Sequence, residues 1–284
     1  MKLGRRICLV LAALLLAAGA RAEEPPRGTL VLRQAGRQSY YLYVARSFAP
    51  GGPVLVSVHG ASRGAEAHAQ AWTEIAERHN LVVVAPLFDM HNFPDYQRLN
   101  LKGPRADLAL HKILEEVGRL TGADARRFYL YGFSGGGQFA HRYALMHPER
   151  LRRVAVGAPG WWTLPDSSLG YPLGVKKTDG VPADVRFRVA EMLRLPLVVI
   201  VGEQDTERDR SLRQEPRVDH LQGRHRLARA RTWFEQARRV AEENGIANGF
   251  ELHIVEGVGH NGTHPAIIAR AAAFLFPPAT AEQE

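Results

Sequence analysis

The residues best suited to chemistry lie in one glycine-rich stretch, Gly132-Phe133-Ser134-Gly135-Gly136, which has the pattern Gly-x-Ser-x-Gly. It stands between an apolar run, residues 128–131, and a helical pattern, residues 138–146. A serine on a very sharp strand-to-helix turn projects its hydroxyl clear of the sheet, and the residues two positions before and after it must be small. This context predicts that Ser134 is a nucleophile. The alternatives are a glycine-rich phosphate loop and a plain turn.

A serine that attacks a carbonyl group needs backbone donors for the oxygen that becomes negative. The first donor expected is the N–H of Gly135, directly after Ser134. The helix that begins there adds the positive end of its dipole.

On both sides of this stretch, segments with the hydrophobic period of a helix alternate with segments typical of a strand. They predict the helices and strands that hold Ser134 in place. Helices are expected at residues 65–79, 105–120, 138–146, 228–243 and 265–276. Short strands are expected at residues 29–33, 39–44, 54–58, 81–85, 128–131, 154–156, 197–201 and 250–255. The first two strands pair across a turn, and the others read as buried. This alternation predicts an α/β fold with a mostly parallel central sheet and helices on both faces.

With the motif in that setting, the chain resembles α/β-hydrolase fold proteins. It is similar to secreted esterases of the polyhydroxybutyrate depolymerase and feruloyl esterase type, over essentially all of the chain after residue 22. The resemblance implies the α/β-hydrolase fold and hydrolysis of carboxylic esters. The motifs that carry the resemblance are specific for the fold and the chemistry, but they do not define the substrate.

The resemblance also implies the partners of Ser134. It places the general base on the loop after the last strand, at His260. It places the orienting acid in Gly202-Glu203-Gln204-Asp205, where Asp205 is the preferred residue and Glu203 the alternative. The resulting chain order, Ser134, Asp205, His260, is that of this fold.

The second oxyanion donor is expected in His59-Gly60-Ala61-Ser62, which follows the strand at residues 54–58. By resemblance the donor is the N–H of Ala61, with Ser62 as the alternative. The stretch departs from the glycine-rich loop of many lipases. His59 is interpreted as a structural hydrogen-bonding residue.

Two long segments interrupt the alternation and are expected to be functional or mobile. Residues 157–195 form a predicted lid or pocket insertion, in which Trp161 and Trp162 either bind substrate or pack in the core. Residues 203–227 are rich in arginine and overlap an arginine-rich run, 208–239, in which acidic residues are interspersed. A solvated mixed-charge surface is therefore favoured over a polyanion site.

No metal or organic cofactor is expected. His260 and His264 have a spacing found in metal sites, but no third ligand accompanies them at a recognisable interval. His264 is interpreted as a polar residue at a helix start.

The first 22 residues have the pattern of a secretory signal peptide. Basic residues precede an apolar run at residues 7–18, and Ala20-Arg21-Ala22 offers a cleavage site before Glu23. An uncleaved membrane helix is the alternative. The only cysteine, Cys8, lies inside the apolar run, so neither a lipid anchor nor a disulfide is indicated. A periplasmic or secreted protein without a stable membrane anchor is expected.

Residues 23–284 are long enough for one large domain. The net charge of +8 includes the four basic residues of the first 22, Lys2, Arg5, Arg6 and Arg21, so removing them leaves +4. This mildly basic balance does not indicate a nucleic-acid partner.

These patterns together predict an exported serine hydrolase that cleaves carboxylic esters through a Ser-His-Asp triad and an acyl-enzyme intermediate. The partner is a small-molecule or polymeric ester. Two alternatives stay open: a peptidase of the same fold, and a catalytically silent exported binding protein on a hydrolase scaffold. No pattern in the sequence indicates the acyl group, the alcohol or the oligomeric state.

Overall fold

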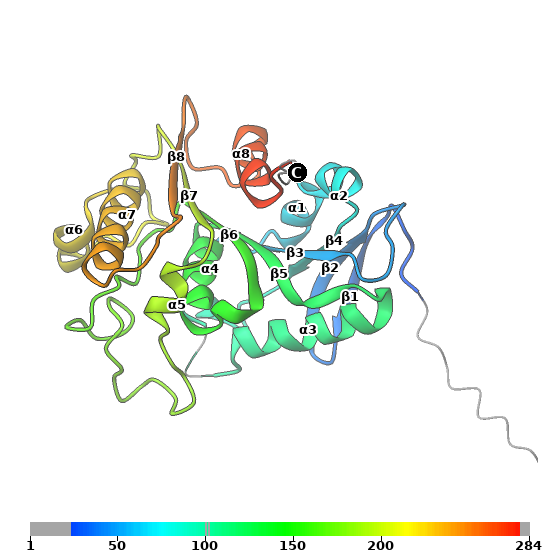
Figure 1. The fold of residues 1–284 in the computed structure, drawn as a ribbon, viewed down its shortest axis with the longest axis horizontal. Coiled ribbons are helices and arrows are strands. Elements are labelled where there is room, and N and C mark those ends of the chain that lie inside the picture. The colour runs from blue at the N-terminus through cyan, green and yellow to red at the C-terminus, as the bar shows by residue number, and fades with distance from the viewer. Residues whose placement is uncertain (1–23, 100, 102, 279–284) are drawn as a thin grey trace, which may run out of the picture.

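A computed structural model describes residues 24–99, 101 and 103–278 (Figure 1). The predicted signal peptide and Glu23 lie outside these residues. The described chain folds around one eight-stranded sheet with the order β1-β2-β4-β3-β5-β6-β7-β8. The predicted fold class, α/β with a mostly parallel sheet, is confirmed.

The strands have two orientations. The antiparallel part is β1 and β2, with β2 also antiparallel to β4, and all later pairs from β3 to β8 are parallel. The strands are β1 Leu30–Ala35, β2 Gln38–Val44, β3 Pro53–Val58, β4 Val82–Pro86, β5 Asp124–Phe133, β6 Leu151–Gly157, β7 Leu197–Gly202 and β8 Glu251–Val255. Every residue of β4 and β7 is buried, as expected for strands covered on both faces.

Helices lie on both sides of the sheet (Figure 1). On one side lie α1 Ala65–Gln70, α2 Thr73–His79 and α8 Pro265–Leu275, and on the other α3 Ala106–Thr121 and α4 Gly135–Met146. The remaining helices are α5 Val189–Leu193, α6 Pro216–Gln222 and α7 Arg226–Glu243, with short 3₁₀ turns at Tyr96–Arg98 and Pro148–Arg150. None of the helices in the described ranges is long and apolar enough to span a bilayer.

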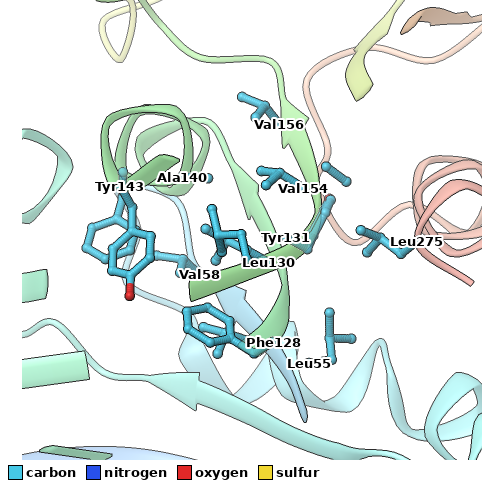
Figure 2. Packing of buried hydrophobic residues seen from close by; sticks show 14 of the residues in the cluster. Leu55, Val58, Phe128, Leu130, Tyr131, Ala140, Tyr143, Val154, Val156 and Leu275 are labelled. Carbon is cyan, nitrogen blue, oxygen red and sulfur yellow. The ribbon is translucent and has the colours of Figure 1, made fainter. Parts of the chain in front are cut away.

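The central strand β5 sends alternate side chains into two apolar layers (Figure 2). Phe128 packs against Tyr143 of α4, with ring centroids 5.7 Å apart. Tyr131 points to the other face and packs edge-on against Trp72, with ring centroids 5.1 Å apart. The end of β5 is therefore fixed from both sides, and the turn that follows it is held rigidly.

Three element predictions differ from the structure. The single helix expected at residues 65–79 is two short helices, α1 and α2, separated at Trp72, whose indole is fully buried. Helices α5 and α6 lie inside segments expected to be loops. Strand β5 begins at Asp124, four residues before the expected start.

Candidate active site

Ser134 stands in a strained turn between β5 and α4. Its backbone has φ 56° and ψ −113°, and its N–H donates to the carbonyl of Gly157 at 2.8 Å. A Cβ at Gly132 would lie 2.1 Å from the Gly136 oxygen, and one at Gly136 would lie 2.0 Å from the Val58 oxygen. Both glycines are required by close backbone approach, as the motif predicts.

His260 lies on the loop between β8 and α8. Its Nε2 is 3.0 Å from the Oγ of Ser134, and its ring packs against Phe133 with centroids 4.9 Å apart. The loop comes this close because Gly262 has no side chain, since a Cβ there would lie 2.3 Å from the Phe133 ring. The imidazole is thus placed to take a proton from the serine hydroxyl.

Asp205 follows β7 and is buried, with 2% of its surface exposed. Its Oδ2 lies 2.6 Å from Nδ1 of His260. Donation from Nδ1 to this carboxylate leaves Nε2 of His260 free to accept from Ser134. Glu203, the alternative acid, is exposed and accepts instead from the N–H of Gly257 at 3.2 Å. The structure brings Ser134, His260 and Asp205 together in one hydrogen-bonded row.

Arg226 was not predicted, yet it contacts the acid directly. It is fully buried at the start of α7, and its Nη1 lies 3.3 Å from Oδ1 of Asp205. The same guanidinium donates to Asp209 at 3.1 Å and to the Oγ of Ser211 at 2.6 Å. Burial opposes ionisation of Asp209, but the hydrogen bonds from Arg226 and Ser211 outweigh it and hold its pKa below the usual range. Arg226 therefore ties the acid to the loop beside Ser134.

The proposed oxyanion donors lie next to each other. The amide nitrogen of Ala61 is 3.3 Å from the position that a Cβ on Gly135 would occupy. Both residues line a cavity that contains Ser134. The arrangement suits two N–H donors for one oxygen, and this role stays a prediction for Ala61 and Gly135.

His59 fixes the loop that carries Ala61. Its Nδ1 donates to the carbonyl of Gly60 at 2.8 Å, and its Nε2 accepts from the N–H of Phe88 at 3.1 Å. Burial lowers the pKa of His59 to about 4, so the ring is neutral near pH 7. The hydroxyl of Tyr96 donates to the His59 carbonyl at 2.8 Å and braces the loop from the other side. This agrees with the structural interpretation of His59.

Ser134 lies between two cavities. One, of about 330 Å³, is lined by His260, His68, Phe133 and the glycines of the neighbouring loops. The other, of about 490 Å³, is lined by Tyr96, Gln138, Trp161 and four arginines. Ala61, Ser134 and Ser211 border both cavities, so a substrate bound at Ser134 has room on either side.

The two tryptophans have different surroundings. Trp161 lines the larger cavity, as a substrate-binding residue would. Trp162 does not border either cavity at Ser134; it is fully buried and stacks on Trp233 with ring centroids 4.4 Å apart. Of substrate binding and core packing, the two alternatives for Trp162, the structure supports core packing, because its indole is buried against Trp233 of α7.

The two long segments contribute differently to the cavities at Ser134. Of residues 157–195, only Trp161 borders the cavities at Ser134. Residues 210–213 of the other segment line the larger cavity instead. The solvated surface expected for residues 208–239 is wrong for Arg226 and Arg229, which are fully buried and bound to Asp209 and Asp219.

His264 is an N-cap residue. Its Nδ1 accepts from the N–H of Ala266 at 3.2 Å at the start of α8. Across the part of the chain that the structure describes, no three His, Cys, Asp or Glu side chains are grouped as a metal site requires.

Comparison with known proteins identifies the fold. No family model and no curated protein matches the sequence. Among solved structures, a poly(3-hydroxybutyrate) depolymerase from Bordetella parapertussis has a TM-score of 0.73 at 29% identity, over 84% of this chain and 83% of that chain. Poly(aspartic acid) hydrolase-1 from Sphingomonas sp. KT-1 has a TM-score of 0.75 at 25% identity, over 87% and 97%.

An S-formylglutathione hydrolase from Agrobacterium tumefaciens has the same fold, with a TM-score of 0.56 at 17% identity over 87% of this chain and 94% of that chain. The chain therefore has the α/β-hydrolase fold, and the resemblance drawn from its sequence is confirmed. The depolymerase and the poly(aspartic acid) hydrolase, at 29% and 25% identity, support a serine hydrolase of this fold.

Proposed function

We propose that the protein is an exported carboxylic ester hydrolase in which Ser134 is the nucleophile, His260 the general base and Asp205 the orienting acid. The observation that carries this proposal is the row of contacts from Asp205 Oδ2 to His260 Nδ1, 2.6 Å, and from His260 Nε2 to Ser134 Oγ, 3.0 Å. A serine hydroxyl is a weak nucleophile until a base removes its proton.

In the first half-reaction the Ser134 oxygen bonds to the ester carbonyl carbon while its proton passes to Nε2 of His260. The carbonyl oxygen becomes negative and accepts from the N–H groups of Gly135 and Ala61. The bond from carbon to the alcohol oxygen then breaks, and that oxygen takes the proton from His260. The products are free alcohol and an acyl ester on Ser134.

In the second half-reaction water attacks the acyl carbon and gives its proton to His260. The bond to the Ser134 oxygen breaks, and this oxygen takes the proton back from Nε2. A free carboxylic acid leaves and the resting site is restored. Asp205 stabilises the charged imidazole in both halves.

An amide hydrolase is the second candidate. One similar structure is named a poly(aspartic acid) hydrolase, and the units of a poly(aspartic acid) chain are joined by amide bonds. An ester and an anilide with the same acyl group separate the two candidates, because only the leaving group differs. We expect the ester to be hydrolysed much faster; a faster anilide would favour the peptidase.

Labelling with a fluorophosphonate tests the assignment of Ser134 as the nucleophile. It also tests the alternative that the protein is a catalytically silent binding protein. The wild-type chain should be labelled at Ser134 and should cleave short-chain aryl esters. Ser134→Ala should lose both. Ser62→Ala is the matched control, because Ser62 borders the same cavity, the hydrogen bonds of the His260 side chain go to Asp205 and Ser134, and the substitution keeps the backbone N–H considered as an alternative oxyanion donor. Full esterase activity in pure Ser134→Ala would refute the proposal.

Export is proposed from the first 22 residues alone. N-terminal sequencing of protein recovered outside the cytoplasm should begin at Glu23. Recovery of the full-length chain in the membrane fraction would support the uncleaved helix instead.

A further inference from the structure

The larger cavity beside Ser134 is strongly basic. Among the described residues that line it are four arginines, Arg63, Arg98, Arg210 and Arg213, and no aspartate or glutamate. Guanidinium groups are always protonated near pH 7, so the walls carry a concentrated positive charge. A wall of this composition needs a ligand or a neighbouring acid to balance it.

Neighbouring acids balance only two of these arginines. Arg213 pairs with Glu215 at 2.7 Å, and Arg98 pairs with Asp95. Arg63 and Arg210 have no ion pair with any carboxylate in the described part of the chain, at a limit of 4.0 Å. The Arg63 side chain is held by backbone carbonyls, among them that of Phe93 at 3.2 Å, so its charge stays fixed at the cavity.

A further arginine lies behind the wall without a counter-ion. Arg142 of α4 is fully buried, and its partners are all neutral, including Thr163 Oγ1 at 2.9 Å and Gln138 Oε1 at 3.2 Å. Within the described chain its Nη2 has no hydrogen-bond partner. Burial lowers its pKa to about 10, which still leaves it charged near pH 7.

Trp161 connects this buried charge to the cavity. Its ring contacts two guanidinium groups, with Arg142 at 4.5 Å and Arg213 at 4.3 Å from the ring centre. A buried charge with no counter-ion is unfavourable, and an anion in the adjacent cavity would offset it. The guanidinium fork also matches the geometry of a carboxylate.

The position of His260 decides which half of a substrate enters this cavity. The leaving alcohol must take its proton from Nε2 of His260, so it lies in the smaller cavity, which His260 lines. The acyl group then extends in the other direction, past Gly135 and Gln138 into the arginine-lined cavity.

Given the proposed esterase activity, we infer that the arginine-lined cavity binds a carboxylate at the far end of the acyl group. The preferred substrates are monoesters of dicarboxylic acids, and the two unpaired arginines, Arg63 and Arg210, are the specificity-determining residues at the cavity wall.

The test compares aryl monoesters of succinate, glutarate and adipate with the matched methyl aryl diesters, in which the far charge is masked. At the best chain length the charged ester should have a kcat/KM about ten-fold higher, which corresponds to about 1.4 kcal/mol. The preference should shrink as salt is added, because salt screens exposed charges. Equal rates at every length would overturn the inference.

Arg210→Gln tests the residue assignment, because Arg210 is exposed and its loss should leave the fold intact. The charged-ester preference, taken as the ratio of kcat/KM for the monoester to kcat/KM for the diester, should fall about three-fold. Arg217→Gln is the matched control, since Arg217 is an exposed arginine of the same segment that does not line the cavity. Equal effects of both variants would assign the preference to overall charge and overturn the role of Arg210.

Calorimetry on Ser134→Ala separates this inference from the proposed function. This variant should bind monomethyl glutarate more tightly than dimethyl glutarate. If the wild type cleaves neutral esters but neither binding nor kcat/KM favours the charged partner, the inference alone fails. If no ester is cleaved, the proposed function fails, and the binding comparison still decides whether the cavity takes a carboxylate.

Discussion

His260 accepts the Ser134 proton only while its ring is held in one tautomer, and the carboxylate that holds it is the residue-scale feature most open to test. Asp205→Asn should lower kcat by about 10⁴, because an amide partner favours the wrong tautomer. Glu203→Gln should leave kcat unchanged, since Glu203 contacts the Gly257 N–H and not the imidazole. Steady-state kinetics of the two purified variants provide the measurement.

Each of these two variants is the control for the other, because both carboxylates follow β7 and lie two residues apart. An active Asp205→Asn together with an inactive Glu203→Gln would reverse the assignment of the acid.

The three residues of the hydrogen-bonded row were predictable from the sequence, because a local motif or a position in the fold specifies each of them. Ser134 has its own motif, and Asp205 and His260 follow strands at the same sheet edge. Arg226 was missed because its contact with Asp205 joins residues 21 apart with no shared pattern. Tyr96, which braces the oxyanion loop from 37 residues away, gave no local signal either. Such residues are recognised only when tertiary contacts are known.

At the scale of elements, the β5–α4 turn depends on close backbone packing. Gly136→Ala should remove activity and lower the free energy of unfolding by more than 1 kcal/mol, because its Cβ would lie 2.0 Å from the Val58 oxygen. Gly249→Ala is the control, since a Cβ there meets nothing within 4 Å and Gly249 lines neither cavity at Ser134. Ester hydrolysis and urea unfolding measure the two effects. Similar losses in both variants would show that the close approach is not the cause.

Helices α3 and α4 are joined by a buried carboxylate. Asp107 is fully buried and accepts from Arg105 at 2.6 Å and from His147, at the end of α4, at 2.8 Å. Burial opposes ionisation, but these bonds hold the pKa of Asp107 below its usual range. Asp107→Asn should lower the free energy of unfolding by about 3 kcal/mol, because it leaves Arg105 without its buried partner.

Asp184→Asn removes the other acid that contacts Arg105, at 3.1 Å. Asp184 is 67% exposed, so its loss should cost at most about 1 kcal/mol in urea unfolding. Equal costs for the two variants would mean that burial of Asp107 adds nothing to the link between the helices.

Elements with a clear local pattern were predictable from the sequence, and elements whose bounds depend on distant contacts were not. Long amphipathic or fully apolar patterns predicted the bounds of α3, α7 and the inner strands to within a few residues. The break between α1 and α2 was not predictable, because the local apolar pattern continues through Trp72, while the residue it packs against, Tyr131, lies 59 residues away in the chain. Helix α6 has seven residues, too few to show a helical period among the arginines around it.

At the scale of the whole molecule, buried neutral histidines make stability depend on pH. Burial lowers the pKa of His59 and His68 to about 4 each, from 6.5. The unfolded chain therefore binds more protons than the folded chain between pH 6.5 and pH 4. Their contribution to stability is complete above pH 6.5 and is lost progressively as the pH falls to 4. The free energy of unfolding should fall by at most about 1.4 kcal/mol per pH unit for each histidine.

Urea unfolding at several values between pH 7 and pH 4.5 measures this slope, and two variants assign it. His68→Gln should reduce the change in the free energy of unfolding by about 1 kcal/mol per pH unit, because glutamine takes up no proton in either the folded or the unfolded chain. His91→Gln is the control and should leave the slope unchanged, since the His91 side chain is exposed. Buried or paired aspartates with lowered pKa, such as Asp107 and Asp209, lose their contribution mainly below this window, and the comparison of His68→Gln with wild type cancels what carboxylates add within it. A slope that is the same in wild type and His68→Gln would show that His68 becomes protonated without unfolding, and that its burial does not limit stability in acid.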